Sequence, residues 1–349
     1  MRVKNLSQRG MSLIELMVAL GLGVFLILGV VNVFVSNKDS TQVETSLARL
    51  QENGRIALDI LAGEVRDAMF IGCTSANRQL TVMADSADPQ WMQGYERTSV
   101  GWSPALDASL AAINTQNRVG SDVIDLARGV RIGTGVGLQA SANVGIGNAN
   151  IPVTANSECL QSGDQVMIAN CGGTSLFEIT NTPACDGSAT TLVFGAGANT
   201  PPTLTAGYRA GDSLYRMRGT VWYVMDTGRT RLNGAVPVYA LVRRTNGGSV
   251  EEIIEGVEYM QILYGQKLAN GNLRYVPAND ATLDMEQVVS LRIALLLQSF
   301  EPVLDADDTV AYQVLDQSID SAGTTYTHNG DKTLRRVFTT TAILRNRDI

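Results

Sequence analysis

The side chains that could carry out acid–base, nucleophilic or metal chemistry are few and scattered along the sequence. The 349-residue chain has one histidine, His328, and four cysteines with no C-x-x-C pair. A histidine-based zinc site needs several converging ligands, and the cysteine spacing fits neither a zinc ribbon nor a thioredoxin-type motif. His328 lies in a turn sequence without a nucleophile motif such as G-x-S-x-G, so we expect a surface histidine and not a catalytic base.

Two other candidate binding motifs lack the spacing that binding requires. Asp305, Asp307 and Asp308 form an acidic cluster without the glycine and terminal glutamate of an EF-hand loop, so we expect a solvated loop and no calcium site. The glycines of residues 133–150 do not follow the G-x-G-x-x-G spacing, and no P-loop lysine follows them. We expect a mobile loop there. The sequence predicts no enzyme, no cofactor and no bound metal.

The charge balance excludes a globally basic nucleic-acid-binding protein. The chain has 27 Lys and Arg against 34 Asp and Glu, a formal net charge of −7 and a pI near 4.9. Two basic pairs, Arg243-Arg244 and Arg335-Arg336, fall at the ends of predicted strands without interleaved aromatic residues. We therefore expect ordinary salt bridges at these pairs and no direct contact with nucleic acid.

The N-terminal segment is the most informative part of the sequence. Residues 1–10 contain basic residues and no acidic one, and residues 16–35 contain no charged residue. A helix over that run is long enough to cross a bilayer core of ~30 Å, and the preceding basic residues keep the N-terminus cytoplasmic. Glu15 lies at the start of the run. A carboxylate near hydrocarbon usually has a functional partner; the alternative is a solvated residue at the interface.

The string G-M-S-L-I-E, from Gly10 to Glu15, follows a basic leader and precedes an uninterrupted apolar helix. This arrangement resembles the class III signal of type IV pilins. The resemblance implies that a prepilin peptidase cuts after Gly10 and that Met11 becomes the N-methylated first residue, although the family usually has phenylalanine there. Glu15 is then the fifth mature residue. Its carboxylate can pair with the terminal amine of a neighbouring subunit, since this pair is favoured over either lone charge in a low dielectric.

Apolar residues at spacings near three, four and seven continue beyond the apolar run, from Val43 to Met69. We expect one helix over residues 12–69, on the order of 85 Å long. Its first half belongs to the membrane or the filament core, and its second half packs on a sheet. Gly54 and Gly63 are expected to weaken this helix locally.

The rest of the chain is predicted to be irregular at first and then rich in β-strands. Turn signals favour irregular structure over residues 73–118, with the clustered Trp91, Tyr95 and Trp102 in a loop tucked over the helix. Period-two alternation then predicts mainly antiparallel strands, with a tight hairpin turn at Arg218-Gly219-Thr220. The predicted strands are residues 123–126, 165–169, 176–180, 191–194, 213–218, 221–226, 238–243, 257–264, 288–299 (a central strand) and 335–344.

Four stretches in this half, residues 211–218, 253–265, 287–299 and 335–347, look like the PilW family of minor pilins. The same order recurs more loosely in the J-type minor pseudopilins of type II secretion. The resemblance covers nearly the whole chain, with residues 75–118 and 133–157 least alike. It implies an α+β, pilin-like fold in which a long N-terminal α-helix packs on a large, mainly antiparallel β-sheet region. The implied segments are a removed leader (1–10), a transmembrane or filament-core helix (11–35), an amphipathic half-helix (36–72), a loop region (73–118) and a β-rich periplasmic domain (119–349).

The resemblance implies a low-copy subunit that helps to initiate type IV pilus assembly near the filament tip, in support of motility, adhesion or DNA uptake. The implied partners are other minor pilins, the major pilin, a tip adhesin, the prepilin peptidase and the inner-membrane assembly machinery. The chain would cross the inner membrane once before entering the pilus. A type II secretion pseudopilin is one alternative, and a signal-anchored periplasmic binding or hydrolytic domain is another.

The four cysteines are expected in a periplasmic, disulfide-permissive compartment. They allow three connectivities. A hairpin of the strands at residues 165–169 and 176–180 places Cys171 at its turn and brings Cys159 near Cys185. Cys171 is then left for Cys73 at the end of the long helix. We therefore favour the pairs Cys73–Cys171 and Cys159–Cys185.

Overall fold

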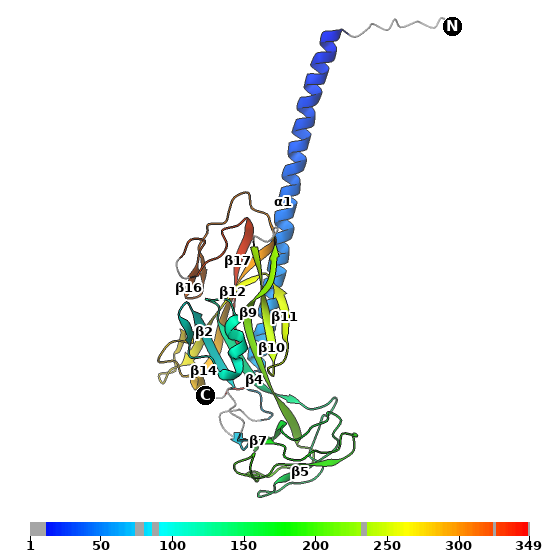
Figure 1. Ribbon diagram of the computed structural model, residues 1–349, viewed down its shortest axis with the longest axis vertical. Helices are drawn as coiled ribbons and strands as arrows, with labels where there is room; N and C mark the ends of the chain where they lie inside the picture. The colour runs from blue at the N-terminus through cyan, green and yellow to red at the C-terminus, as the bar shows by residue number, and fades with distance from the viewer. Residues whose placement is uncertain (1–11, 74–79, 86–90, 232–235, 324–325, 348–349) are drawn as a thin grey trace, which may run out of the picture.

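A long helix and a β-rich body make up the molecule (Figure 1). The computed structural model describes residues 12–73, 80–85, 91–231, 236–323 and 326–347. Helix α1, Leu13–Asp67, has 55 residues, which corresponds to about 82 Å. The predicted helix is confirmed to within two residues at each end. Only its C-terminal half, from Leu50 onward, has buried side chains, so its N-terminal half projects from the body (Figure 1).

Two principal sheets form the body, and nearly all of their strand pairs are antiparallel, as predicted. The larger has nine strands, in the order β1-β7-β6-β9-β4-β2-β3, with β10 and β11 added beside β9. The smaller has four, in the order β13-β12-β14-β17. Two short pairs, β5–β8 and β15–β16, complete the body. Only the β1–β7 pair is parallel among the described strands.

The strand bounds agree with most of the predicted strands. In the larger sheet they are β1 Leu80–Val82, β2 Met92–Thr98, β3 Gly101–Ser103, β4 Val123–Arg131, β6 Gln165–Asn170, β7 Gly173–Glu178, β9 Ser213–Arg231, β10 Val236–Thr245 and β11 Val250–Glu255. The others are β12 Val257–Lys267, β13 Leu273–Val276, β14 Val288–Pro302, β17 Thr333–Ile343, β5 Asn150–Val153, β8 Thr190–Val193, β15 Tyr312–Val314 and β16 Gln317–Ile319. The 3-10 helices are η1 Ala108–Thr115 and η3 Met285–Gln287.

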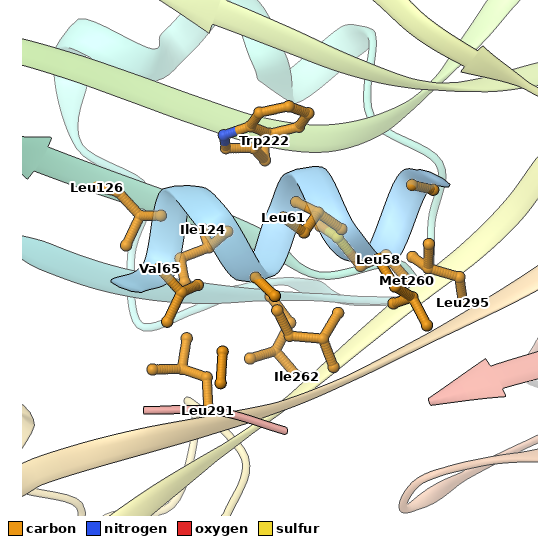
Figure 2. Packing of buried hydrophobic residues seen from close by; sticks show 14 of the residues in the cluster. Leu58, Leu61, Val65, Ile124, Leu126, Trp222, Met260, Ile262, Leu291 and Leu295 are labelled. Atoms are coloured by element: carbon orange, nitrogen blue, oxygen red, sulfur yellow. The ribbon is translucent and has the colours of Figure 1, made fainter. Parts of the chain in front are cut away.

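The C-terminal half of α1 is buried between the two sheets. Figure 2 shows Trp222 of β9 on one side of the helix and Ile262 and Leu291 of the smaller sheet on the other. Leu61 and Val65 of the helix are at most 1% exposed. Burying a side chain of this size contributes about 1.5–3 kcal/mol. The helix is therefore part of the core of the body.

Strand β14 is the central strand that its sequence predicts. It pairs with β12 on one side and with β17 on the other. Leu291 and Leu295 point into the core around the helix, whereas Ala294 and Leu296 pack under the β15–β16 hairpin. Both faces of β14 are thus covered, which explains its nearly continuous apolar sequence.

The predicted hairpin turn at Arg218-Gly219-Thr220 is wrong. Strand β9 runs through these residues without a break and is 19 residues long. Gly219 pairs with Ala127 of β4, and its N–H donates to the side chain of Asn246 at 2.8 Å. The first part of β9 pairs with β6 and the second with β10. The turn signal is overridden because the strand finds partners on both sides of it.

The described residues of two segments that were expected to be irregular or mobile take part in strand pairs and bridges. Residues 73–118 contain β2, which pairs with β4 in the larger sheet. Within residues 133–150, Ala140 and Val144 are buried and form single bridges to Val153 and Tyr208. Turn-forming residues flank these short pairings, so the alternation that would identify strands is too brief to detect.

The clustered aromatic residues of this region do not all lie over the helix. Trp91 packs against the core around α1. Tyr95 is buried beside β9 and β10, and Trp102 packs against the same cluster together with η1. The expectation of a loop tucked over the helix therefore holds for Trp91 alone.

Two disulfides fix the part of the body beyond the helix end. Cys73 is bonded to Cys171 and Cys159 to Cys185, the same pairs that the hairpin argument favours. Cys171 lies at the β6–β7 turn, so the first bond joins the chain after α1 to a segment 98 residues away in sequence. In the loop-entropy model a loop of this size stabilises the fold by roughly 4–5 kcal/mol.

Gly54 allows the ring of Phe338 on β17 to approach the helix backbone closely. A Cβ atom at Gly54 would lie 2.6 Å from Cδ2 of Phe338, whereas a Cβ at Gly63 would meet no atom within 4 Å. Gly54→Ala should therefore lower the free energy of unfolding by about 1–3 kcal/mol through overpacking. Gly63→Ala should raise it by about 0.5–1 kcal/mol through helix propensity.

Urea unfolding of the full chain in detergent measures both effects on the same helix. Opposite shifts of the two midpoints are expected. An equal gain in stability for both variants would show that Gly54 is not needed for the packing of Phe338.

Candidate functional site

The projecting half of α1 is the first candidate site. Its apolar side chains are exposed along its whole length, from Leu13 to Val35. By length and composition α1 could span a membrane, and none of its most apolar 18-residue window is buried in the body. Side chains such as Phe25, which is 79% exposed, are stable only in lipid or against other apolar surfaces. This half of the helix therefore requires a bilayer or neighbouring helices.

The helix begins with a capping box that includes Glu15. The Ile14 N–H donates to Oγ of Ser12 at 3.3 Å, and the Ser12 N–H donates to Oε2 of Glu15 at 3.1 Å. The two side chains thus satisfy backbone groups that have no partner within the helix. Glu15 also places a negative charge at the positive end of the helix dipole. In the single chain, the Glu15 carboxylate accepts this hydrogen bond from the backbone of Ser12.

Our sequence interpretation did not assign a role to Ser12. The signal was present as S-x-x-E before an apolar run, which is the pattern of a capping box. The cleavage and methylation positions, Gly10 and Met11, lie outside the described residues. Of the residues predicted to take part in processing and assembly, the structure describes Glu15.

Polar contacts fix the other end of the helix to the body. The Arg128 side chain of β4 lies 2.5 Å from Asp67 and 3.7 Å from Glu64. The side-chain amide of Asn346 donates to the carbonyl oxygens of Arg66 and Ala68 at 3.3 and 3.0 Å. The last turn is thus joined to the larger sheet and to the C-terminal tail. A force on the projecting half is transmitted to both.

A buried ion-pair network around Arg335 confirms one expectation and corrects another. Arg335 of β17 is fully buried and contacts Glu258 at 2.7 Å, Asp331 at 3.0 Å and Asp308 at 3.2 Å. Salt bridging at Arg335 is therefore confirmed. Asp308, however, is not in a solvated loop, because its carboxylate is needed to compensate a buried guanidinium.

His328 is not a surface residue, as its turn sequence had suggested. It is 2% exposed, and its two ring nitrogens lie 2.9 Å from the Val310 carbonyl and 3.1 Å from that of Asn329. Its ring packs edge-on against Tyr312. The imidazole joins two loops of the body. Among the described residues, no group of three or more histidine, cysteine or acidic side chains could hold a metal ion.

Two buried carboxyl groups make the body sensitive to pH. Glu96 on β2 and Asp122 before β4 are at most 5% exposed. Burial first, and then the charge of Asp316, raise the pKa of Glu96 from 4.5 to about 7. Burial and the charge of Glu96 also raise the pKa of Asp122, whose carboxylate accepts the Ile262 N–H at 2.7 Å.

The fold and the projecting helix together define a membrane-anchored, pilin-like protein, with a long apolar helix set into an antiparallel β-body. Two family models match the chain. The prokaryotic N-terminal methylation motif matches residues 5–31, and the family described as Type IV Pilus-assembly protein W matches residues 222–346. Residues 222–346 are therefore similar to the Type IV pilus-assembly protein W (PilW) family, and residues 5–31 carry the prokaryotic N-terminal methylation motif.

The two matched segments cover a smaller part of the chain than we expected, since the sequence resemblance had extended over nearly the whole chain. They leave residues 32–221 outside. This interval holds strands β1 to β8, the start of β9, and all four cysteines. A search of the curated proteins finds no relative that matches.

The raised pKa of Glu96 predicts that stability falls as pH rises. Between its unfolded value near 4.5 and its folded value near 7, the folded chain binds the extra proton, so the free energy of unfolding decreases with pH. The loss should be on the order of 1–3 kcal/mol by pH 8. Glu96→Gln should remove the part of the loss that Glu96 contributes, while Asp122 and Asp125, whose pKa values burial also raises, should retain theirs.

Urea midpoints at pH 5 and pH 8 measure the effect in the full chain. Glu52→Gln, on the exposed face of α1, is the matched control and should leave the wild-type pH dependence unchanged. The prediction fails if Glu96→Gln loses as much stability between the two pH values as the wild type.

Proposed function

We propose that this chain is a minor pilin that helps to initiate type IV pilus assembly and lies near the pilus tip with other minor pilins. The observation that carries the proposal is the exposed apolar half of α1 together with the methylation motif at its start. A bilayer covers this surface before assembly, and the helices of neighbouring subunits cover it in a filament. Members of the family are generally structural proteins and not enzymes.

The geometry of Glu15 supports a role in setting the position of subunits. Its carboxylate offers about four acceptor sites, and a single chain uses one of them, for the Ser12 N–H. Cleavage after Gly10 gives Met11 a terminal amine, which can pair with Glu15 of a neighbour. The pair forms most strongly where lipid or packed helices exclude water.

The shape of the body supports a position near the tip. The part of the body around β5 and β7 extends beyond the C-terminal end of α1, along the direction of the helix (Figure 1). In a filament of parallel, staggered helices the same space belongs to the next subunit toward the tip. A subunit with this extension fits best where few or no subunits follow it.

The proposed role assigns a function to each segment of the chain. Residues 1–10 form a removed cytoplasmic leader, residues 11–35 the inner-membrane and filament-core helix, and residues 36–72 the segment that contains the amphipathic half of the helix. The side chains of this half are buried in the body from Leu50 onward, and the helix ends at Asp67. Residues 73–118 join residues 119–349 in one periplasmic body, because β2 lies in the larger sheet. The proposed partners are other minor pilins, the major pilin, a tip adhesin, the prepilin peptidase and the inner-membrane pilus machinery.

A type II secretion pseudopilin is the second candidate within the same class, since it shares the apolar helix and its processing. A deletion strain distinguishes the two. Loss of surface pili, with twitching motility, adhesion or DNA uptake, supports the pilus. Loss of secreted enzymes with normal pili supports the secretion filament.

The charge of Glu15 can be tested separately from its capping role. Glutamine at this position still completes a capping box but cannot pair with an amine. Glu15→Gln should leave the chain in the membrane at normal level, while its recovery in sheared pili falls about tenfold or more, corresponding to at least about 1.4 kcal/mol. Immunoblots of membrane and sheared fractions measure both.

Ser12→Ala is the matched control, because it removes the other half of the capping box and keeps the carboxylate. Its recovery in pili should stay within about twofold of wild type, since an exposed cap contributes only ~1 kcal/mol to helix stability. Normal recovery of Glu15→Gln would contradict the pairing role. An equal loss for both variants would assign the effect to the helix start.

A further inference from the structure

An arginine-lined cleft lies where the end of α1, strand β4 and the C-terminal tail meet. It has a volume of about 500 Å³. Four arginines line it, Arg66 from the helix, Arg128 and Arg131 from β4, and Arg345 from the tail, together with the carboxylate of Asp67. This concentration of positive charge contrasts with the net charge of −7 of the whole chain.

Most of the positive charge in the cleft is not compensated by acidic side chains of the described residues. Arg128 is engaged by Asp67 and Glu64. The other three arginines have no acidic partner within 4 Å among the described residues. Elsewhere in the body, arginines such as Arg243 and Arg335 are paired with carboxylates. The cleft therefore favours a ligand that supplies negative charge.

The wall formed by β4 also presents a free backbone position at its end, at Arg131. Strand β2 pairs with β4 only as far as Leu126. Beyond it, the Ala127 N–H donates to the Trp91 carbonyl at 2.9 Å and the Gly129 N–H to the Phe70 carbonyl at 2.6 Å. The free part of this edge is therefore the last residue of the strand, Arg131, with which no described segment pairs on this side. An open strand edge is completed by an extended segment of another chain, through main-chain hydrogen bonds.

The position of the cleft excludes lipid as the source of the negative charge. Asp67 follows the end of the apolar run at Val35 by 32 residues of continuous helix, a separation of about 48 Å. Nucleic acid is also disfavoured. Phe70 is the one aromatic side chain among the described residues that line the cleft, whereas grooves for single-stranded nucleic acid stack successive bases on several aromatic rings.

We propose that this cleft binds an extended acidic peptide segment of another periplasmic protein. Guanidinium groups bind carboxylates in a bidentate geometry, and the free backbone of Arg131 at the end of β4 pairs with the backbone of the same segment. Side chains of an extended peptide alternate, so acidic residues at every second position face the arginines. The binding is a property of the body and does not depend on whether the filament is a pilus or a secretion filament.

Fluorescence anisotropy with the full chain in detergent tests this proposal. The probe is a labelled peptide of alternating glutamate and valine. The variant Arg131→Glu/Arg345→Glu reverses two exposed cleft residues, and Arg55→Glu/Arg209→Glu reverses two exposed arginines elsewhere, so both variants change the net charge equally. The cleft variant should bind at least about tenfold more weakly, and the control should stay within about twofold of wild type.

A charge-swapped probe separates loss of binding from loss of structure. A peptide of alternating lysine and valine should bind the Arg131→Glu/Arg345→Glu variant more tightly than the wild type. Equal binding of the acidic peptide to wild type and cleft variant would overturn the proposal, as would the absence of saturable binding to the wild type. Tighter binding of a single-stranded DNA 20-mer through the same arginines would also overturn it.

Discussion

The burial of the C-terminal half of α1 between the two sheets is the constraint on which the rest of the structure depends. The same 55-residue helix must expose apolar side chains in its first half and supply core side chains in its second. Trp222 packs on one side of the helix and Leu291 on the other (Figure 2). Because the helix is part of the core, the projecting half cannot move independently of the body. A pull applied in the membrane or filament therefore acts on the whole folded subunit.

The periodic elements could be predicted from the sequence. The apolar stripe of α1 and the nearly continuous apolar run of β14 reflect local rules that tertiary structure did not override. The continuation of β9 through Gly219 could not be predicted, because it depends on pairing with β4 and β10, which come from distant parts of the chain. His328 was misassigned for a related reason, since the loops that bury it are joined only in three dimensions.

The candidate site likewise has residues that could be predicted from the sequence and residues that could not. Gly10, Met11 and Glu15 could be identified from a short string, since processing and membrane insertion act on local sequence. The capping role of Ser12 was also visible there. The arginine-lined cleft could not be predicted, because its four arginines come from the helix, one strand and the tail. Part of its wall and both disulfides lie outside the family match.

The central claim is that the chain enters the pilin pathway through its N-terminal signal, and the mass of the N-terminal peptide of protein recovered from membranes tests it most directly. A peptide that begins at N-methylated Met11 is the result that this account predicts. A peptide that retains residues 1–10 would contradict it. The body would then be a domain tethered by a signal anchor, and Glu15 would be an interfacial residue without a role in assembly.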